Sequence, residues 1–335
     1  TVDGEGKAMH KSLGNAVGPE EVIKDYGADL LRLWVASADY TQDMRISKEI
    51  MKQLSDAYLK IRNTARYMLG NLNGFDPDTD AVAWENLEEL DKWALSRLNT
   101  LARTVREYYN KYEFHGVYRS VYNFCVVDLS NFYFDVIKDR LYCGHLATRR
   151  SAQTALYRIL DGMTRLIAPI LAFTSDEIWG AMTHAKDANA ESVLLNDMPD
   201  YDPALALDEA AQARWDAAMA LRADVNKALE RARSEKRIGK SLEAAVTLHF
   251  GPEAQAVDSA LAELDAGEMA DLCIVSALDR SAAPVEGYAG EAVPGLTVKV
   301  ESAAGEKCQR CWKYDEHVGE DGLCPRCRSV VDAEG

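Results

Sequence analysis

The sequence predicts a mainly α-helical protein, made of an antiparallel helical bundle, a small α/β junction unit and a C-terminal ribbon with four cysteines. Two observations support this prediction. Apolar residues recur at three- and four-residue steps along four long segments, and two Cys-x-x-Cys pairs lie close together near the end. The 335 residues exceed the usual size of one domain, so we expect two or three compact units.

The bundle helices follow from periodicity and from capping residues. Pro19 to Ser37 is predicted as one helix around Gly27. Ser47 is placed to cap the first long helix, because a serine side chain accepts a hydrogen bond from the first helical turn. His115-Gly116 is expected to break the second long helix, and Pro169 to stop the fourth. Short loops make the long helices antiparallel; we expect them at Ser47 to Leu72, Glu88 to Tyr112, Val117 to Tyr142 and Arg149 to Ala168, with a shorter one at Thr174 to Met182.

The chain changes character after a proline-rich, polar linker at Asn189 to Pro203. A helix is expected from about Asp208 to Lys236, and a second helix from Glu253 to Leu264. The pattern predicts strands at Ala245 to Phe250, Leu272 to Val275 and Leu296 to Val300, which together suggest a small α/β unit.

The net charge of −16 argues superficially against a nucleic-acid partner, because phosphate binding requires Lys and Arg. The distribution of charge matters more than the sum. From Arg222 to Lys240 there are seven basic residues against three acidic ones, whereas residues 251–305 are acidic. The charge therefore leaves RNA binding open. No apolar run approaches the ~18 residues of a membrane span, so we expect no membrane partner.

The four terminal cysteines indicate a metal site. The pairs Cys308/Cys311 and Cys324/Cys327 are separated by twelve residues, and two such knuckles can bring four thiolates together tetrahedrally, as Zn²⁺ prefers in a closed structural site. One zinc ion per chain would then supply much of the folding energy, and Trp312 would cover the small core. Two disulfides or a redox pair are the alternatives, and His317 is the only rival ligand nearby.

Three other cysteines, Cys125, Cys143 and Cys273, are isolated within apolar surroundings, where we expect small buried hydrophobes. This cysteine usage fits a reducing cytoplasm better than a disulfide framework.

The opening segment predicts a mobile, glycine-rich loop that presents Lys11. It does not fit the Walker pattern. Residues 8–12 resemble the second signature loop of class I aminoacyl-tRNA synthetases, Lys-Met-Ser-Lys-Ser. Met9, Lys11 and Ser12 fit this pattern, whereas Ala8 replaces its first lysine and His10 its first serine.

Further stretches are similar to synthetases for branched aliphatic amino acids, and the ribbon with Trp312 after Cys311 is similar to the ending of bacterial-type isoleucyl-tRNA synthetases. The resemblance covers nearly the whole chain and is weakest over residues 251–295. The stretches that carry it are Gly27 to Trp34, Lys60 to Leu72, Asn131 to Tyr142 and Ala168 to Trp179.

The resemblance implies four segments: the signature loop and stem-contact region (1–45), the anticodon-binding bundle (46–200), the junction domain with its leading helix (201–304) and the zinc ribbon (305–335). The chain begins with Thr and enters straight into a loop, so we expect it to be the C-terminal portion of a longer monomeric, cytoplasmic enzyme and to be inactive alone.

By the same resemblance, the parent would use ATP with Mg²⁺ to activate isoleucine and then charge isoleucine tRNA. Met9, His10, Lys11 and Ser12 would form the ATP-binding loop, with Lys11 as the catalytic residue that stabilises charge on the phosphates. We expect Tyr108, Tyr109 and Tyr112 in the core, because two of them continue the apolar register. Candidate tRNA contacts are Arg62, Asn63, Arg66, Arg222, Lys227, Arg233, Lys236 and Arg237.

Three alternatives remain open from the sequence. The parent could be the valyl, leucyl or methionyl enzyme. The chain could be a non-catalytic zinc-ribbon RNA-binding protein, in which Lys11 is merely a loop lysine. It could also be a plain helical scaffold that binds no tRNA.

Overall fold

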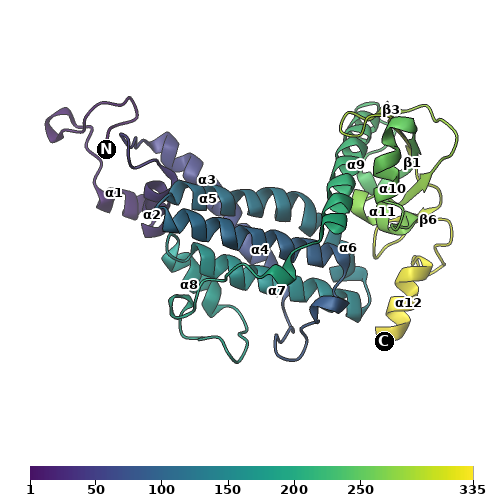
Figure 1. The fold of residues 1–335 in the computed structure, drawn as a ribbon, viewed down its shortest axis with the longest axis horizontal. Coiled ribbons are helices and arrows are strands. Elements are labelled where there is room, and N and C mark those ends of the chain that lie inside the picture. The colour runs from purple at the N-terminus through teal and green to yellow at the C-terminus, as the bar shows by residue number, and fades with distance from the viewer. Residues whose placement is uncertain (335) are drawn as a thin grey trace. The chain divides into compact units, whose positions relative to one another are not determined.

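The computed structural model describes residues 1–334, and the chain divides into two compact units. The first comprises Thr1–Phe134 and Arg150–Ala206, and the second Asp135–Arg149 and Leu207–Gly335. The fold is mainly helical with small sheets, as the sequence predicts. Figure 1 shows residues 1–18 of the first unit as a long loop ahead of the helices.

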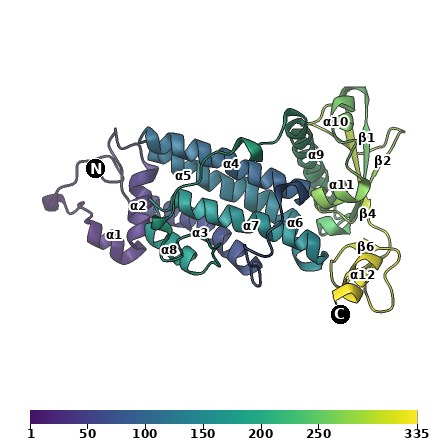
Figure 2. The same cartoon turned by 60° about the horizontal axis from the view of Figure 1, so that its bottom comes forward.

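The first unit is a helical bundle in which α3, α4, α5 and α7 run side by side (Figures 1 and 2). Ser47 caps α3 as expected, because its hydroxyl accepts a hydrogen bond from the Ile50 N–H at 3.2 Å. The chain stays helical from Phe114 to Cys143, with a π-helical stretch at Phe124–Tyr133. The helices of residues 1–206 are α1 (Pro19–Tyr26), α2 (Ala28–Ser37), α3 (Lys48–Asn71), α4 (Glu89–Asn110), α5 (Phe114–Asn123), α6 (Phe134–Cys143), α7 (Leu146–Ile167) and α8 (Ala172–Gly180). Of these, α6 from Asp135 onward and the start of α7 up to Arg149 belong to the second unit.

A buried carboxylate joins three helical segments of this bundle. Asp91 on α4 is fully buried, and it accepts hydrogen bonds from the Tyr133 hydroxyl at 2.7 Å and the Ser151 hydroxyl at 2.6 Å. The Ser151 oxygen in turn accepts from the Glu88 N–H at the start of α4. A satisfied network of this kind fixes the relative register of the helices, because an unpaired buried polar group is costly.

Two expectations about helix breaks are wrong. Gly27 adopts φ 88°, a conformation that L side chains resist, and it separates α1 from α2. Gly116 does not break a helix but lies inside α5, where a Cβ would approach the Tyr108 ring to 2.5 Å. The break comes earlier, at Tyr112, which has φ 58°.

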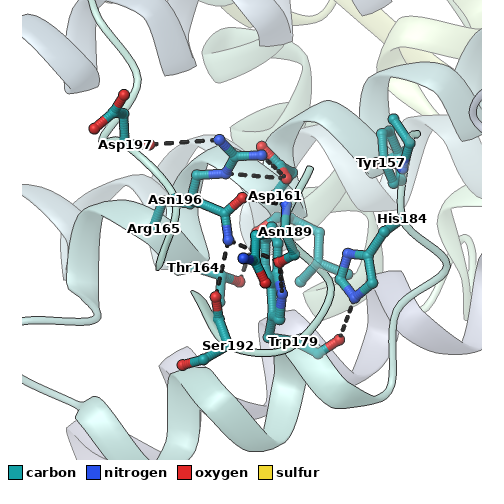
Figure 3. Close-up of polar contacts among 12 residues, drawn as sticks. Tyr157, Asp161, Thr164, Arg165, Trp179, His184, Asn189, Ser192, Asn196 and Asp197 are labelled. Carbon is teal, nitrogen blue, oxygen red and sulfur yellow. Dashed lines mark hydrogen bonds and ion pairs between the residues drawn. The ribbon is translucent and has the colours of Figure 1, made fainter. Parts of the chain in front are cut away.

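The linker after α8 is packed rather than loose (Figure 3). Trp179, which is 1% exposed, donates its indole N–H to the Asn189 carbonyl at 3.0 Å, and His184 Nε2 lies 2.9 Å from the Trp179 carbonyl. Asn196 donates to the Asn189 and Ser192 carbonyls, both at 2.9 Å. Arg165 on α7 also donates to the Asp197 carbonyl at 3.4 Å, so the segment from residue 184 to 197 is held against α7 and α8.

The second unit contains a four-stranded sheet in the order β2-β1-β4-β3, with α9 against it (Figure 2). β1 pairs with β4 antiparallel and with β2 parallel. Alternate residues of β1 are buried, which gives the sheet one core face. Its main elements are α9 (Glu209–Ser234), β1 (Ala244–Phe250), α10 (Gln255–Ala260), α11 (Ala266–Cys273), β2 (Ala277–Arg280), β3 (Tyr288–Ala289) and β4 (Leu296–Ser302), and the ribbon holds β5 (Glu306–Lys307), β6 (Tyr314–Asp315) and α12 (Pro325–Glu334).

The strand expected at Leu272 to Val275 is wrong, because its first two residues end α11. Asp265 and Glu268 form a reciprocal capping box that starts this helix. Ile274 then turns the chain with φ 57°, and the strand begins at Ala277. The two other predicted strands are confirmed as β1 and β4.

Candidate nucleic-acid interface and metal centre

The opening loop is closed at its base by one asparagine. The Asn15 amide donates to Asp3 Oδ2 at 2.8 Å and to the Ala8 carbonyl at 3.2 Å, and its oxygen accepts from the His10 N–H at 2.9 Å. Asp3 also accepts from the Glu5 and Lys7 N–H groups, and these donors, Asn15 first, lower the pKa of its carboxyl.

Lys11 is exposed at the far end of this closed loop, in a short 3₁₀ turn that ends at Gly14 with φ 66°. Among residues 1–334 no hydrogen bond or ion pair engages its side chain. Met9 is half-buried, whereas His10 and Ser12 are exposed. Lys7, one position away from the missing signature lysine, is paired with Glu5 at 2.7 Å.

The loop is tied to the bundle through α2. The Val2 N–H donates to the Met44 carbonyl at 2.8 Å, and the Trp34 indole donates to the Arg45 carbonyl at 3.0 Å. Asp29 accepts from the Thr174 N–H and hydroxyl, both at 2.6 Å. These bonds fix the base of the loop to the start of α8 in the same unit.

Candidate RNA-contact residues on α3 lie on its solvent side. Arg62 is half-buried, with a guanidinium nitrogen 3.9 Å from the Glu177 carboxylate, and Asn63 and Arg66 are exposed. Ile61 and Ala65 on the opposite side are buried. The expected separation of the polar and apolar faces of α3 is therefore present.

The basic stretch along α9 is less uniform than the sequence suggests. Arg222 is wrong as an RNA contact, because it is only 7% exposed and burial lowers the pKa of its guanidinium. Lys227 pairs with Glu291 at 2.6 Å, and Arg233 donates to the Ser241 hydroxyl at 2.6 Å. Lys236 and Arg237 are exposed just after the helix. The available cations therefore gather at the C-terminal end of α9.

The four terminal cysteines form one cluster, and their sulfur atoms all lie within 4.8 Å of one another. The Cys311 and Cys324 sulfurs are 3.8 Å apart, close to the ~3.8 Å edge of a tetrahedron with Zn–S bonds of about 2.3 Å. All four are free of disulfides. His317 is exposed and pairs with Asp315, outside the metal-ligand cluster found among the described residues. The donor set therefore fits a closed zinc site.

The ribbon is held against α6 by two contacts of the second unit. Arg326 binds the Asp139 carboxylate through both guanidinium nitrogens, and Arg310 donates to the Cys143 carbonyl at 3.0 Å. The expected burial of Cys125, Cys143 and Cys273 is confirmed, and burial raises the pKa of the Cys125 and Cys273 thiols to about 12.

Two aromatic residues that the sequence predicts to be buried, Trp312 and Tyr112, are exposed. Trp312 does not cover the ribbon core: it is 58% exposed, has φ 66°, and carries the Lys307 ammonium 5.3 Å from its ring centroid. Tyr112 is 67% exposed, whereas the Tyr109 hydroxyl donates a hydrogen bond to the Leu166 carbonyl. Left-handed φ values in large residues indicate functional positions or strain. No local sequence signal distinguishes such residues from core aromatics.

Comparisons with known proteins agree with this arrangement. Residues 1–47 match the family model of tRNA synthetases class I (I, L, M and V), residues 91–248 match the anticodon-binding domain of tRNA ligase, and residues 305–330 match the zinc finger found in FPG and IleRS. The chain therefore carries family signatures of class I aminoacyl-tRNA synthetases.

The particular family follows from full-length relatives. The chain is 52% identical to isoleucine–tRNA ligase of Syntrophotalea carbinolica and 49% identical to that of Geobacter sulfurreducens, over 98% of its own length. It belongs to the isoleucine–tRNA ligase family, and it spans 36% of the length of these relatives. These matches favour the isoleucyl family over the valyl, leucyl and methionyl families.

A solved chain from the ternary complex of Agrobacterium radiobacter K84 agnB2 LeuRS with tRNA and LeuAMS covers 74% of this chain and 25% of its own length, with a TM-score of 0.46 and 14% identity. A similarity at this level carries no further argument. No helix of residues 1–334 is long and apolar enough to cross a lipid bilayer.

Proposed function

We propose that this chain is the C-terminal, tRNA-binding part of a cytoplasmic, monomeric isoleucine–tRNA ligase. The parent enzyme activates isoleucine with ATP and Mg²⁺ to an aminoacyl-adenylate, releases pyrophosphate and transfers isoleucine to its tRNA. The observation that carries the proposal is the presence of three functional segments in one chain: a closed loop with a free lysine, a helical anticodon-binding bundle and a four-thiol ribbon.

Lys11 is the residue of this chain that acts in the chemistry. Its ammonium group, carried on an exposed turn, stabilises the charge that develops on the ATP phosphates during isoleucine activation. Met9, His10 and Ser12 shape the turn around it. Replacement of Lys11 by Ala in the full-length ligase should slow activation about 10²–10³-fold, the effect of removing one such donor. Its tRNA affinity should stay unchanged, because the proposed tRNA contacts lie on α3 and around the end of α9 and do not include Lys11.

The tRNA is held by cations and exposed aromatic rings rather than by net charge. Arg62, Asn63 and Arg66 on α3, and Lys227, Arg233, Lys236 and Arg237 around the end of α9, are the proposed phosphate and base contacts. Trp312 with Lys307 offers a ring on which an unpaired base can stack. The zinc ion, bound by Cys308, Cys311, Cys324 and Cys327, holds the small ribbon in shape and plays no catalytic role, since all four positions are taken by protein ligands.

Binding of tRNA to the chain, measured against salt concentration, tests this proposal. We expect the logarithm of the association constant to fall linearly with the logarithm of salt concentration, with isoleucine tRNA bound more tightly than valine tRNA. Equal and salt-insensitive binding of the two tRNAs would contradict the proposal.

A further inference from the structure

A cleft of about 690 Å³ lies in the second unit, beside the most basic stretch of the chain. It is lined by the last turns of α9, the segment that follows α9, the outer edge of β4 and the approach to β3. This volume is typical of small-ligand sites. Of its lining, the proposed function so far uses only Arg237.

The cleft exists because the sheet opens at one corner. β3 pairs with β4 only at Tyr288↔Val298 and Ala289↔Thr297, whereas β1 follows β4 as far as Ser302. The chain before Tyr288 is close enough that a Cβ at Gly287 would lie 2.2 Å from the Val298 carbonyl oxygen. Beyond that point no strand covers the outer edge of β4 within residues 1–334.

An added peptide strand is not the occupant that this edge favours. Arg237 places its guanidinium on the Val300 carbonyl, and the Ser302 hydroxyl donates to the Arg237 carbonyl at 3.1 Å. The Val300 carbonyl, an acceptor on the edge of β4 that a new strand would need, is therefore already hydrogen-bonded, and this disfavours the addition of a strand.

Two guanidinium groups converge at the cleft on one acceptor. Arg231 Nε donates to one Glu235 oxygen at 2.9 Å, and Arg237 Nε donates to the other at 2.8 Å. The pair lowers the pKa of the Glu235 carboxyl. Two guanidinium groups on separate oxygens of one anion also match a phosphate group. All three side chains are exposed, so their ion pairs are weak and a phosphate can replace the carboxylate.

The rest of the lining fits a nucleobase. Ala228, Val298 and Val300 give an apolar floor, and Tyr288 adds an aromatic ring. Glu286 and Glu301 also line the cleft, and their carboxylates disfavour a run of several phosphates. They are acceptors for the amino groups on the edges of an unstacked base.

We propose that this cleft binds a single unpaired nucleotide of the bound tRNA, with its phosphate on Arg231 and Arg237 and its base against Tyr288. The proposal rests on the tRNA-binding function given above. It adds two residues to the proposed RNA contacts: Arg231, which belongs to the basic stretch from Arg222 to Lys240, and Tyr288, which the sequence did not indicate.

The test compares binding of isoleucine tRNA to the unaltered chain and to an Arg231→Gln/Arg237→Gln variant, by fluorescence anisotropy over a salt series. The variant should bind about 5–20-fold more weakly, with the slope of log K against log[salt] reduced by about 1, as expected when one phosphate loses its cations. Arg214→Gln is the matched control: it lies on the same helix, pairs with Glu263 at 2.5 Å and is outside the cleft lining. This control should bind like the unaltered chain.

A Tyr288→Leu variant separates base stacking from charge. It should weaken binding about fivefold or more and leave the salt slope unchanged. If the Arg231→Gln/Arg237→Gln variant keeps the affinity and slope of the unaltered chain, or if the Arg214→Gln control loses as much, the cleft proposal is wrong and the tRNA-binding function stands. If the unaltered chain binds no tRNA, the proposed function is wrong and the cleft proposal falls with it. Thermal melting of each variant checks that it is folded.

Discussion

Asp224 is the residue whose replacement should most clearly report on the architecture around the cleft. This carboxylate on α9 is fully buried, and it accepts hydrogen bonds from three consecutive backbone N–H groups, those of Glu291 and Ala292 at 3.0 Å and of Val293 at 2.8 Å. It thereby fixes the segment between β3 and β4 to the helix. We expect Asp224→Asn to release this segment.

The magnitude follows from the three bonds. An amide keeps one acceptor oxygen, so the two bonds to Glu291 and Ala292 lose their ionic reinforcement, about 1 kcal/mol each. Its NH₂ group then faces the Val293 N–H, and a buried donor without an acceptor costs about 1–3 kcal/mol. The sum is about 3–5 kcal/mol, which should lower the melting temperature of this unit by roughly 10 °C.

Two measurements check this prediction. Calorimetry reports the melting temperature, and hydrogen exchange reports whether the amides of residues 291–293 lose protection before the rest of the unit. Asp216→Asn is the control, because Asp216 is exposed on the same helix and accepts only from the Gln212 side chain at 2.8 Å. A melting temperature within 2 °C of the unaltered chain, with unchanged protection of residues 291–293, would refute the reasoning.

Three further predictions concern the metal, the loop and pH. The purified chain should contain about one zinc per molecule, and Cys324→Ser should abolish zinc binding and make residues 305–330 sensitive to protease. The reason is that the metal supplies most of the folding energy of so small a ribbon. Metal analysis measures the zinc content, and limited proteolysis measures the sensitivity. In the full-length ligase, Asn15→Ala should raise the KM for ATP in isoleucine activation about tenfold without changing the affinity for tRNA. The reason is that the hydrogen bond to Asp3 no longer closes the loop that carries Lys11. An unchanged KM for ATP in pyrophosphate exchange would count against this prediction. Burial raises the pKa of the Asp128 carboxyl in the folded state above its ordinary value of 3.8. The folded state therefore resists ionisation of this group, and stability is lost as the pH rises from the unfolded-state pKa to the folded-state pKa. Urea unfolding between pH 3 and 6 should therefore show Asp128→Asn gaining stability relative to the unaltered chain as the pH increases, and a constant difference would contradict this.

Local patterns in the sequence were sufficient to predict the fold class, the cap of α3 and the gathering of the four cysteines. Ser47 acts within one helical turn, and each Cys-x-x-Cys knuckle is set by its own backbone. The strands β1 and β4 were found because their alternation reflects one buried face. Such features need no knowledge of distant residues.

The errors arose where distant residues decide the outcome. Arg222 belongs to a basic stretch by composition, yet its position on α9 turns it into the interior. Trp312 follows a cysteine and is apolar, yet a left-handed φ turns it outward. A glycine often marks the end of a helix, but Gly116 instead leaves room for the Tyr108 ring. Each of these outcomes depends on tertiary packing, which overrides local preference.

The acidic character of the chain bears on the RNA binding proposed for it. Its cations are largely presented beside carboxylates: Lys227 next to Glu291, Arg231 and Arg237 around Glu235, and Lys299 next to Glu301. A phosphate must therefore compete with a carboxylate at each position, which weakens non-specific attraction to any polyanion. Unpaired bases that reach Trp312 or Tyr288 add stacking that a duplex cannot offer. In the proposed function, discrimination among tRNAs would then come from which nucleotides are unstacked and where, and the negative net charge of the protein would disfavour RNA that offers phosphates alone.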